Sequence, residues 1–284
     1  MTETVEQEAT AVRRARLVVS YVGADFHGFA ASSGHTSVLS ELTRTVSLVA
    51  RQPVELVGAG RTDAGVHAWG QVVSGDLPAD LDLADLMRRV NKMCAPAIAV
   101  RSADWAQPDF DARFSATWRC YRYHIWNDPA PNPLLSTVCW HVPHPLDLLL
   151  MQAAVSPLIG EQDFTSFCRK PKVPDHKPPA SLVRIVHDIS WQRVDDSPML
   201  RLQITGSAFC HQMVRSLTAT MVEVGLHRLT PADVHAILHA RDRSIAGQVA
   251  PPYGLVLWEV GYDGVRWDAA TLHDSGAALD VADD

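Results

Sequence analysis

The stretch that decides the fold reads VELVGAGRTDAGVHA and occupies residues 54–68. Its apolar start, Val54 to Val57, predicts a strand, and the glycines and alanines that follow predict a tight loop, because glycine reaches backbone angles closed to other residues. Arg61 and Asp63 are two residues apart, so both side chains would leave an extended segment on the same side. The pattern favours a loop that presents a carboxylate, and a solvated turn is the alternative.

The composition is that of a globular protein of 284 residues, with 47% hydrophobic and 20% charged residues. No apolar run of about 18 residues occurs and the start of the chain is acidic, so we expect a cytoplasmic protein without a signal peptide or membrane span. The five cysteines include no C-x-x-C pair, and His235 and His239 have no third ligand at suitable spacing. We therefore expect surface histidines, reduced cysteines and no metal.

The net charge of −7 argues mildly against a nucleic-acid partner, because phosphate contacts need lysine and arginine. Much of the acidity falls in the expected tails, residues 1–14 and 266–284, which leaves the body close to neutral. Three of the four lysines lie in one proline-rich stretch. The best local cluster for phosphate contact consists of Arg169, Lys170, Lys172 and Lys177, with a solvated loop as the alternative.

The first hundred residues predict the order β-α-β-β-α-β, the split βαβ arrangement. Expected strands are residues 15–22, 54–57, 71–74 and 97–105, and apolar residues at helical spacing predict helices near 39–49 and over 83–93. The second half repeats this outline. A strand at 117–126, a helix at 146–155, strands at 182–191 and 199–204, and helices at 210–224 and after Thr230 are expected there.

In the expected strand 117–126, aromatic residues alternate with basic ones. Arg119, Tyr121 and Tyr123 would face one side of the sheet and Arg122 the other. The pattern fits an aromatic-rich strand and an RNA-facing surface equally well, since aromatic rings stack on bases and arginines hold phosphates.

These elements predict an α+β fold of two pseudo-repeated split βαβ halves, ferredoxin-like or RRM-like, with antiparallel or mixed sheets and an active-site cleft between them. We place the halves at residues 15–112 and 113–265.

Residues 60–68, GRTDAGVHA, resemble the active-site loop of the tRNA pseudouridine synthase A family. The resemblance extends over about residues 16–262. It includes RCYRY (119–123), FTSF (164–167), FCHQMVR (209–215) and APPYGL (250–255). One departure is visible, since the family has a glutamine shortly after the Gly-Phe pair and this chain has none after Gly28 and Phe29.

The resemblance implies isomerisation of uridine to pseudouridine at positions 38, 39 and 40 of tRNA, by a homodimer that needs no cofactor. It implies that Asp63 is the catalytic residue, that Tyr121 stacks on the target base and that Arg215 pairs with Asp63. Arg61 is suited to filling the gap left by the flipped base or to gripping the backbone, and Leu255 belongs to a segment that resembles the family's closing strand. Whether Asp63 attacks C1′ or removes a sugar proton stays open. The later loss of the C5 proton needs a base, for which Tyr121 is a candidate. An inactive RNA-binding relative and a carboxylate-dependent hydrolase are the alternatives.

Overall fold

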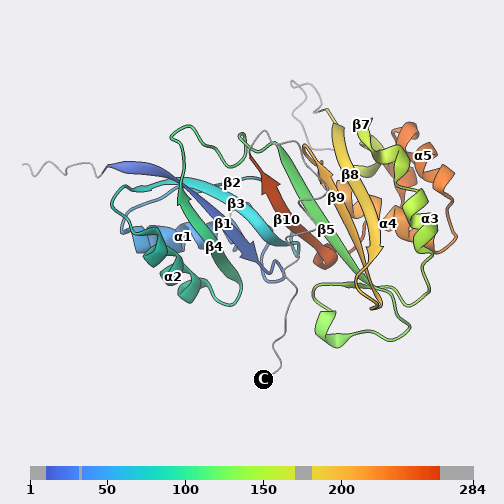
Figure 1. The fold of residues 1–284 in the computed structure, drawn as a ribbon, viewed down its shortest axis with the longest axis horizontal. Helices are drawn as coiled ribbons and strands as arrows, with labels where there is room; N and C mark the ends of the chain where they lie inside the picture. The colour runs from blue at the N-terminus through green and yellow to red at the C-terminus, as the bar shows by residue number, and fades with distance from the viewer. Residues whose placement is uncertain (1–10, 32–33, 170–180, 263–284) are drawn as a thin grey trace, which may run out of the picture.

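One continuous mixed sheet organises the molecule. The computed structural model describes residues 11–31, 34–169 and 181–262, and Figure 1 shows the fold. Within this part of the chain the sheet has ten strands. Eight of them form the path β4-β1-β3-β10-β5-β9-β8-β7, while β2 pairs with β3 and β6 pairs with β5. All pairings are antiparallel except β10 with β3 and β5 with β6, so the predicted α+β class with a mixed sheet is confirmed.

The first half has the predicted split βαβ order. Its elements are β1 (Val12–Tyr21), α1 (Val38–Ala50), β2 (Val57–Gly58), β3 (His67–Pro78), α2 (Leu83–Cys94) and β4 (Ile98–Trp105). The strands lie in the order β4-β1-β3-β2. Helix α1 begins where expected because Ser37 forms a capping box with Ser40, and Asp82 caps α2 in a similar way.

The second half repeats this topology with longer connections. Its elements are β5 (Trp118–Trp126), β6 (Trp140–His141), α3 (Leu148–Ala153), β7 (Gly160–Asp163), β8 (Val183–Arg193), β9 (Met199–Gly206), α4 (Met213–Gly225), α5 (Pro231–Ala240) and β10 (Leu255–Gly261). The order β10-β5-β9-β8 matches β4-β1-β3-β2 of the first half, position for position. The predicted pseudo-repeat is therefore confirmed by the strand order.

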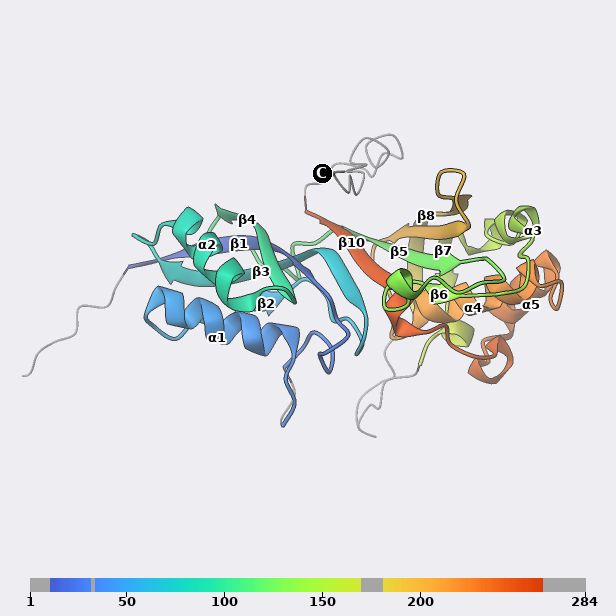
Figure 2. The same ribbon diagram turned by 90° about the horizontal axis from the view of Figure 1, so that it is seen from below.

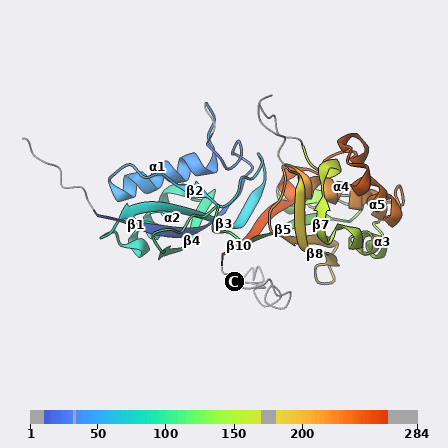
Figure 3. The ribbon, with the colours of Figure 1, turned by 90° about the horizontal axis from the view of Figure 1, so that it is seen from above.

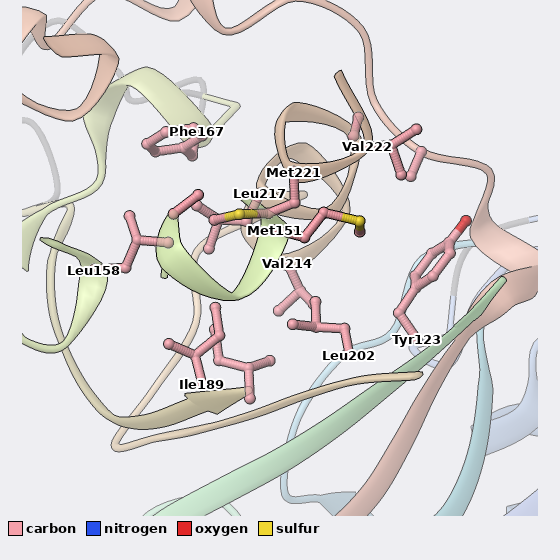
Figure 4. Packing of buried hydrophobic residues seen from close by; sticks show 14 of the residues in the cluster. Tyr123, Met151, Leu158, Phe167, Ile189, Leu202, Val214, Leu217, Met221 and Val222 are labelled. Carbon is pink, nitrogen blue, oxygen red and sulfur yellow. The ribbon is translucent and has the colours of Figure 1, made fainter. Parts of the chain in front are cut away.

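The two halves lie end to end and share the sheet (Figures 2 and 3). They meet where β10 runs parallel to β3, with Val256 opposite His67 and Leu257 opposite Ala68. Each half has its own core. Buried residues of α1 and α2 belong to one, and those of α3, α4 and α5 to the other, which Figure 4 shows around Met151, Leu217 and Met221. Strand β10 contributes Leu255 to the second core and Leu257 to the first, so it ties the two together.

Three elements differ from the sequence prediction. Of the strand expected at residues 54–57, only Val57 belongs to a strand, the two-residue β2. The side chains of Val54 and Leu56 are buried, but these residues do not pair with β3. Strand β3 is much longer than the predicted 71–74. Helix α4 begins at Met213 and not at Cys210, because Gln212 adopts a left-handed conformation with φ of 64°. The division of the chain between residues 112 and 113 stays a prediction.

Candidate active site

A cavity of about 990 Å³ opens between the two halves. Residues of both halves line it, mainly 27–31, 56–64, 113–114 and 208–215, together with Arg119, Tyr121, Arg184 and Leu255. The loop predicted to present a carboxylate therefore forms one wall, and the start of α4 forms the opposite wall. Arg61 and Asp63 both line this cavity, as their spacing predicted.

The carboxylate loop has a defined shape because several contacts hold its backbone. Gly65 has φ of 80°, a conformation that side chains rarely allow, and the Val66 amide donates to the Asp63 carbonyl at 3.1 Å. Thr62 is held twice, since its carbonyl accepts from the Phe29 amide at 3.1 Å and its hydroxyl lies 2.8 Å from the Tyr21 hydroxyl. Asp63 is thus presented from a fixed turn.

Asp63 makes two side-chain contacts across the cavity. The Arg215 guanidinium donates from Nη1 to Oδ2 at 3.0 Å, which brings together the pair implied by the family resemblance. Arg215 also donates from Nε to the carbonyl of Ala250 at 2.7 Å and is only 13% exposed, so its position is fixed. On the other oxygen, the His211 Nε2 atom lies 3.3 Å from Oδ1. The carboxylate is 28% exposed and remains accessible from the cavity.

Both partners of Asp63 lie at the start of α4. Gln212 is left-handed, and this turn places His211 just outside the helix and Arg215 within its first turn. The backbone of His211 is itself held, because its carbonyl accepts from the Arg169 amide at 3.0 Å. His211 lies within the motif at 209–215, but no role was predicted for it. Its spacing of four residues from Arg215, across a helix start, was the available signal.

Tyr121 lies at the floor of the cavity on β5. Its ring meets the ring of Phe209 edge-on, with centroids 5.1 Å apart and an angle of 83°. Burial raises the pKa of the Tyr121 phenol to about 12; nearby Asp63 also raises it, while Arg119 opposes both. Tyr121 therefore keeps its proton at neutral pH. Leu255 lies opposite Tyr123 in the neighbouring strand β10 and is buried where it lines the cavity.

The charged side chains that line the cavity are mainly cationic. Among the described lining residues, Asp63 is the one carboxylate. Five others are arginines, namely Arg61, Arg113, Arg119, Arg184 and Arg215. Arg119 also has a structural task, because its guanidinium donates to four backbone carbonyls, those of Ala59, Arg113, Ala116 and Ser207. In a protein of net charge −7, this concentration of positive charge marks a binding site for an anion.

Comparison with known proteins identifies the family. Residues 154–263 match a family model described as tRNA pseudouridine synthase. The tRNA pseudouridine synthase A of Bacillus subtilis is 35% identical over 253 residues, which cover 88% of this chain and 99% of the relative. This chain belongs to the tRNA pseudouridine synthase A family. Further members are 39% identical in Caulobacter sp. strain K31 and 37% identical in Cutibacterium acnes, each covering 88% of this chain.

A looser likeness exists to the crystal structure of a Cbf5-Nop10-Gar1 complex. It covers 74% of this chain and 44% of that chain, with 12% identity and a TM-score of 0.30.

Not every residue predicted to contact RNA lies at the cavity. Arg122 is buried away from it, donates to the Gln203 side chain at 2.9 Å and lies 3.7 Å over the Trp258 ring. Arg169 is exposed and is not among the lining residues. Lys170, Lys172 and Lys177 lie outside the described residues. Gly28 and Phe29, where the family glutamine is missing, do line the cavity.

Other expectations concern metals, cysteines and membranes. All five cysteines are free thiols, and four of them are buried. His235 and His239 are exposed on α5. In the part of the chain that the structure describes, no three His, Cys, Asp or Glu side chains are grouped to hold a metal ion, and no helix is both long and apolar enough to cross a membrane.

Proposed function

We propose that this protein converts uridine to pseudouridine in the anticodon arm of tRNA, at positions 38, 39 and 40, with Asp63 as the catalytic carboxylate. The observation that carries the proposal is a single accessible carboxylate, fixed by Arg215 at 3.0 Å, in a cavity lined by five arginines. Membership of the tRNA pseudouridine synthase A family supports it. The specific positions rest on the family resemblance.

The reaction breaks the C1′–N1 glycosidic bond, turns the uracil and joins C1′ to C5. A uridine within a stem must first leave the stack, which costs unstacking free energy and needs a pocket that receives the base. Tyr121 offers an aromatic face beside Asp63 for that base. Arg61, exposed on the carboxylate loop, is placed to hold the opened backbone. Asp63 then acts at the sugar, as a nucleophile on C1′ or as a base.

The charge distribution favours an RNA substrate. A tRNA arm brings several phosphates, and the arginines of the cavity can neutralise them although the whole chain is acidic. Phe114, next to Arg113 at the cavity, is 81% exposed. Exposed aromatic rings stack on unpaired bases, so Phe114 is suited to contact the loop of the anticodon arm.

Two alternatives fit the cavity less well. A carboxylate-dependent hydrolase normally needs a second catalytic carboxylate or a bound metal, and Asp63 is the one carboxylate among the described lining residues. An inactive RNA-binding relative would have no reason to keep the Asp63–Arg215 pair beside Tyr121.

We propose that this protein works as a cytoplasmic homodimer. It needs no metal or cofactor in this proposal, since the isomerisation neither adds nor removes electrons. Sedimentation of the purified protein tests the dimer. Activity that survives chelator treatment of the protein tests the absence of a metal.

Replacement of Asp63 by Asn tests the central claim, because it keeps the shape of the side chain and removes its charge. We expect Asp63→Asn to fold and to bind tRNA within about tenfold of wild type, roughly 1.4 kcal/mol. It should form no detectable pseudouridine when the tRNA is digested and its nucleosides are separated. Asp76→Asn, at the exposed Arg14 ion pair far along β3, is the matched control and should remain active. Pseudouridine formed by Asp63→Asn at a rate near wild type would remove Asp63 from the mechanism.

A further inference from the structure

Two cysteine thiols lie against each other in the wall of the cavity, and the roles assigned so far use neither of them. The side chain of Cys168 forms a hydrogen bond with that of Cys210. Cys210 is half-buried and lines the cavity, whereas Cys168 is fully buried. The other three cysteines, Cys94, Cys120 and Cys139, are buried and do not line the cavity. The cavity therefore gives access to a thiol that has a second thiol directly behind it.

The backbone holds these two cysteines side by side. The residue that follows Cys168 donates its amide to the carbonyl of the residue that follows Cys210, at 3.0 Å. A third segment closes around the pair, since the Cys210 Sγ atom lies 3.9 Å from the carbonyl of Leu182. The amide of Phe164 donates to the same carbonyl at 3.1 Å. The contact between the thiols thus joins segments that are far apart in the sequence and are anchored to each other.

The hydrogen bond makes the two thiols chemically unequal. Cys168 donates to Cys210 and lowers the pKa of the Cys210 thiol; burial opposes this shift, and the nearby charge of Arg184 supports it. The same hydrogen bond, together with burial, raises the pKa of Cys168. Because the thiolate is the nucleophile in thiol chemistry, Cys210 is the thiol that reacts first. Burial raises the pKa of Cys120 and that of Cys139 to about 11, which leaves these thiols inert.

We propose that Cys168 and Cys210 are a modification site, at which hydrogen peroxide forms a reversible disulfide that lowers pseudouridine formation. The effect on activity rests on the proposed function, whereas the disulfide itself does not. Disulfides of cytosolic proteins are usually transient and serve catalysis or redox sensing, which fits a pair that reductants can reach through the cavity.

The oxidation takes two steps. The Cys210 sulfur attacks one oxygen of the peroxide, the O–O bond breaks, and the leaving hydroxide takes a proton and becomes water. The Cys168 sulfur then attacks the sulfur of the resulting sulfenic acid, the S–O bond breaks, and the proton of Cys168 leaves with the hydroxide as a second water. The two thiols together lose two electrons, which reduce one peroxide to two waters.

The disulfide acts on the wall of the cavity that faces Asp63. It brings the two sulfurs to about 2.05 Å, closer than hydrogen-bonded thiols lie. The residues on both sides of Cys210 face the site. His211 has its Nε2 atom 3.3 Å from Asp63 Oδ1, and the ring of Phe209 meets that of Tyr121 edge-on. Because a displacement of about 1 Å can lower a rate by about 10²-fold, a shift of this segment lowers activity.

Peptide mapping tests the disulfide without tRNA. The reduced full-length protein is treated with a small excess of hydrogen peroxide, blocked with an alkylating reagent and digested, and its peptides are identified by mass. Wild type should yield a linked pair of peptides that carry Cys168 and Cys210, and dithiothreitol should remove this pair. In Cys168→Ala, dimedone present during the oxidation should trap a sulfenic acid at Cys210. Cys94→Ala is the matched control, since it removes a buried thiol on α2, and it should form the same disulfide as wild type.

Pseudouridine formation by the same samples tests the effect on activity. Peroxide should lower kcat of wild type and of Cys94→Ala by at least about tenfold, and dithiothreitol should restore it. The fraction of activity lost should follow the fraction of linked peptide at each dose of peroxide.

Three results would overturn the proposal. The first is the absence of the linked peptides in wild type. The second is complete linkage with unchanged activity, and the third is a loss of activity that does not follow the linkage or that dithiothreitol does not reverse. Failure of the proposed function looks different, because reduced wild type would then form no pseudouridine while the peptides still decide whether the disulfide exists.

Discussion

Arg215 makes two contacts that a lysine could not make together. One edge of its guanidinium donates to Asp63 Oδ2 and its Nε donates to the carbonyl of Ala250, at 3.0 and 2.7 Å. The Ala250 amide in turn donates to the Arg215 carbonyl at 3.2 Å. A planar guanidinium offers donors in fixed directions, whereas an ammonium is a point charge. Arg215 therefore links the carboxylate loop, helix α4 and the segment that leads to Leu255.

His124 on β5 makes stability depend on pH. Burial, together with the positive charges of Arg201 and Arg122, lowers its pKa to about 4. The unfolded chain takes up a proton near pH 6.5, so between these values the unfolded state binds more protons and stability falls as pH falls. The free energy of unfolding of wild type should fall between pH 7 and pH 5, and that of His124→Gln should fall by about 1 to 2 kcal/mol less. Urea unfolding of both proteins at each pH measures the difference.

Two other histidines bear on this measurement, His67 as a second contributor to the pH dependence and His235 as the control. Burial also lowers the pKa of His67, so the wild-type slope will not disappear entirely in His124→Gln. His235 is exposed on α5, and His235→Gln should leave the slope unchanged. If His124→Gln and wild type lose the same free energy of unfolding, His124 titrates normally in the folded protein.

At the scale of elements, helix α1 supports the cavity through its first turn. The Ser37 side chain accepts from the Ser40 amide at 3.1 Å. The two amides that follow Ser37 hold the loop at the cavity, because Val38 donates to the carbonyl of Gly28 and Leu39 donates to that of Phe29. We expect Ser37→Ala to lower the free energy of unfolding by about 1 kcal/mol, the usual cost of a lost N-cap. It should also reduce activity, because residues 27–31 line the cavity.

Helix α5 provides the control for this prediction. Thr230 caps it with a capping box of the same kind, but α5 is not among the elements that line the cavity. Thr230→Ala should therefore cost about as much stability and leave activity unchanged, as judged by thermal unfolding and pseudouridine formation on the same samples. Equal activity of both variants would show that α1 does not support the cavity.

These elements also show how far sequence reasoning reaches. Ser37 and Thr230 mark helix starts by local chemistry, and the side-chain pattern of residues 117–126 predicted β5 closely. Gln212 shortens α4 because its backbone is left-handed, which no local rule foresees for a glutamine. Arg122 was a candidate RNA contact because aromatic and basic residues alternate in 117–126, yet it stacks on Trp258, a residue far along the chain. Asp63 could be predicted because the whole motif was present, whereas the contact with His211 needed the folded chain.

For the whole molecule, the junction between the halves decides whether the cavity is complete. Asp63 belongs to the first half and Arg215 to the second, while the parallel pairing of β3 with β10 has only two residue pairs. A second feature crosses the same junction. Arg101 of β4 lies 3.8 Å over Trp69 of β3, Trp69 stacks on Trp258 of β10 at 5.9 Å, and Arg122 of β5 lies over Trp258. Four neighbouring side chains thus bind the two halves on the sheet.

Truncation of either tryptophan should loosen this junction. We expect Trp69→Ala and Trp258→Ala each to lower the free energy of unfolding by roughly 1 to 3 kcal/mol. Either single change removes the stacking contact between the two rings. The double variant should therefore lower the free energy of unfolding by about 0.5 to 1.5 kcal/mol less than the sum of the two single changes. Activity should fall as well, since Asp63 and Arg215 must keep their distance across the junction. Trp126 donates to the Ala130 carbonyl at the far end of β5, so Trp126→Ala should add independently to Trp69→Ala. Full additivity of Trp69→Ala and Trp258→Ala in urea unfolding would show that the stack does not join the halves.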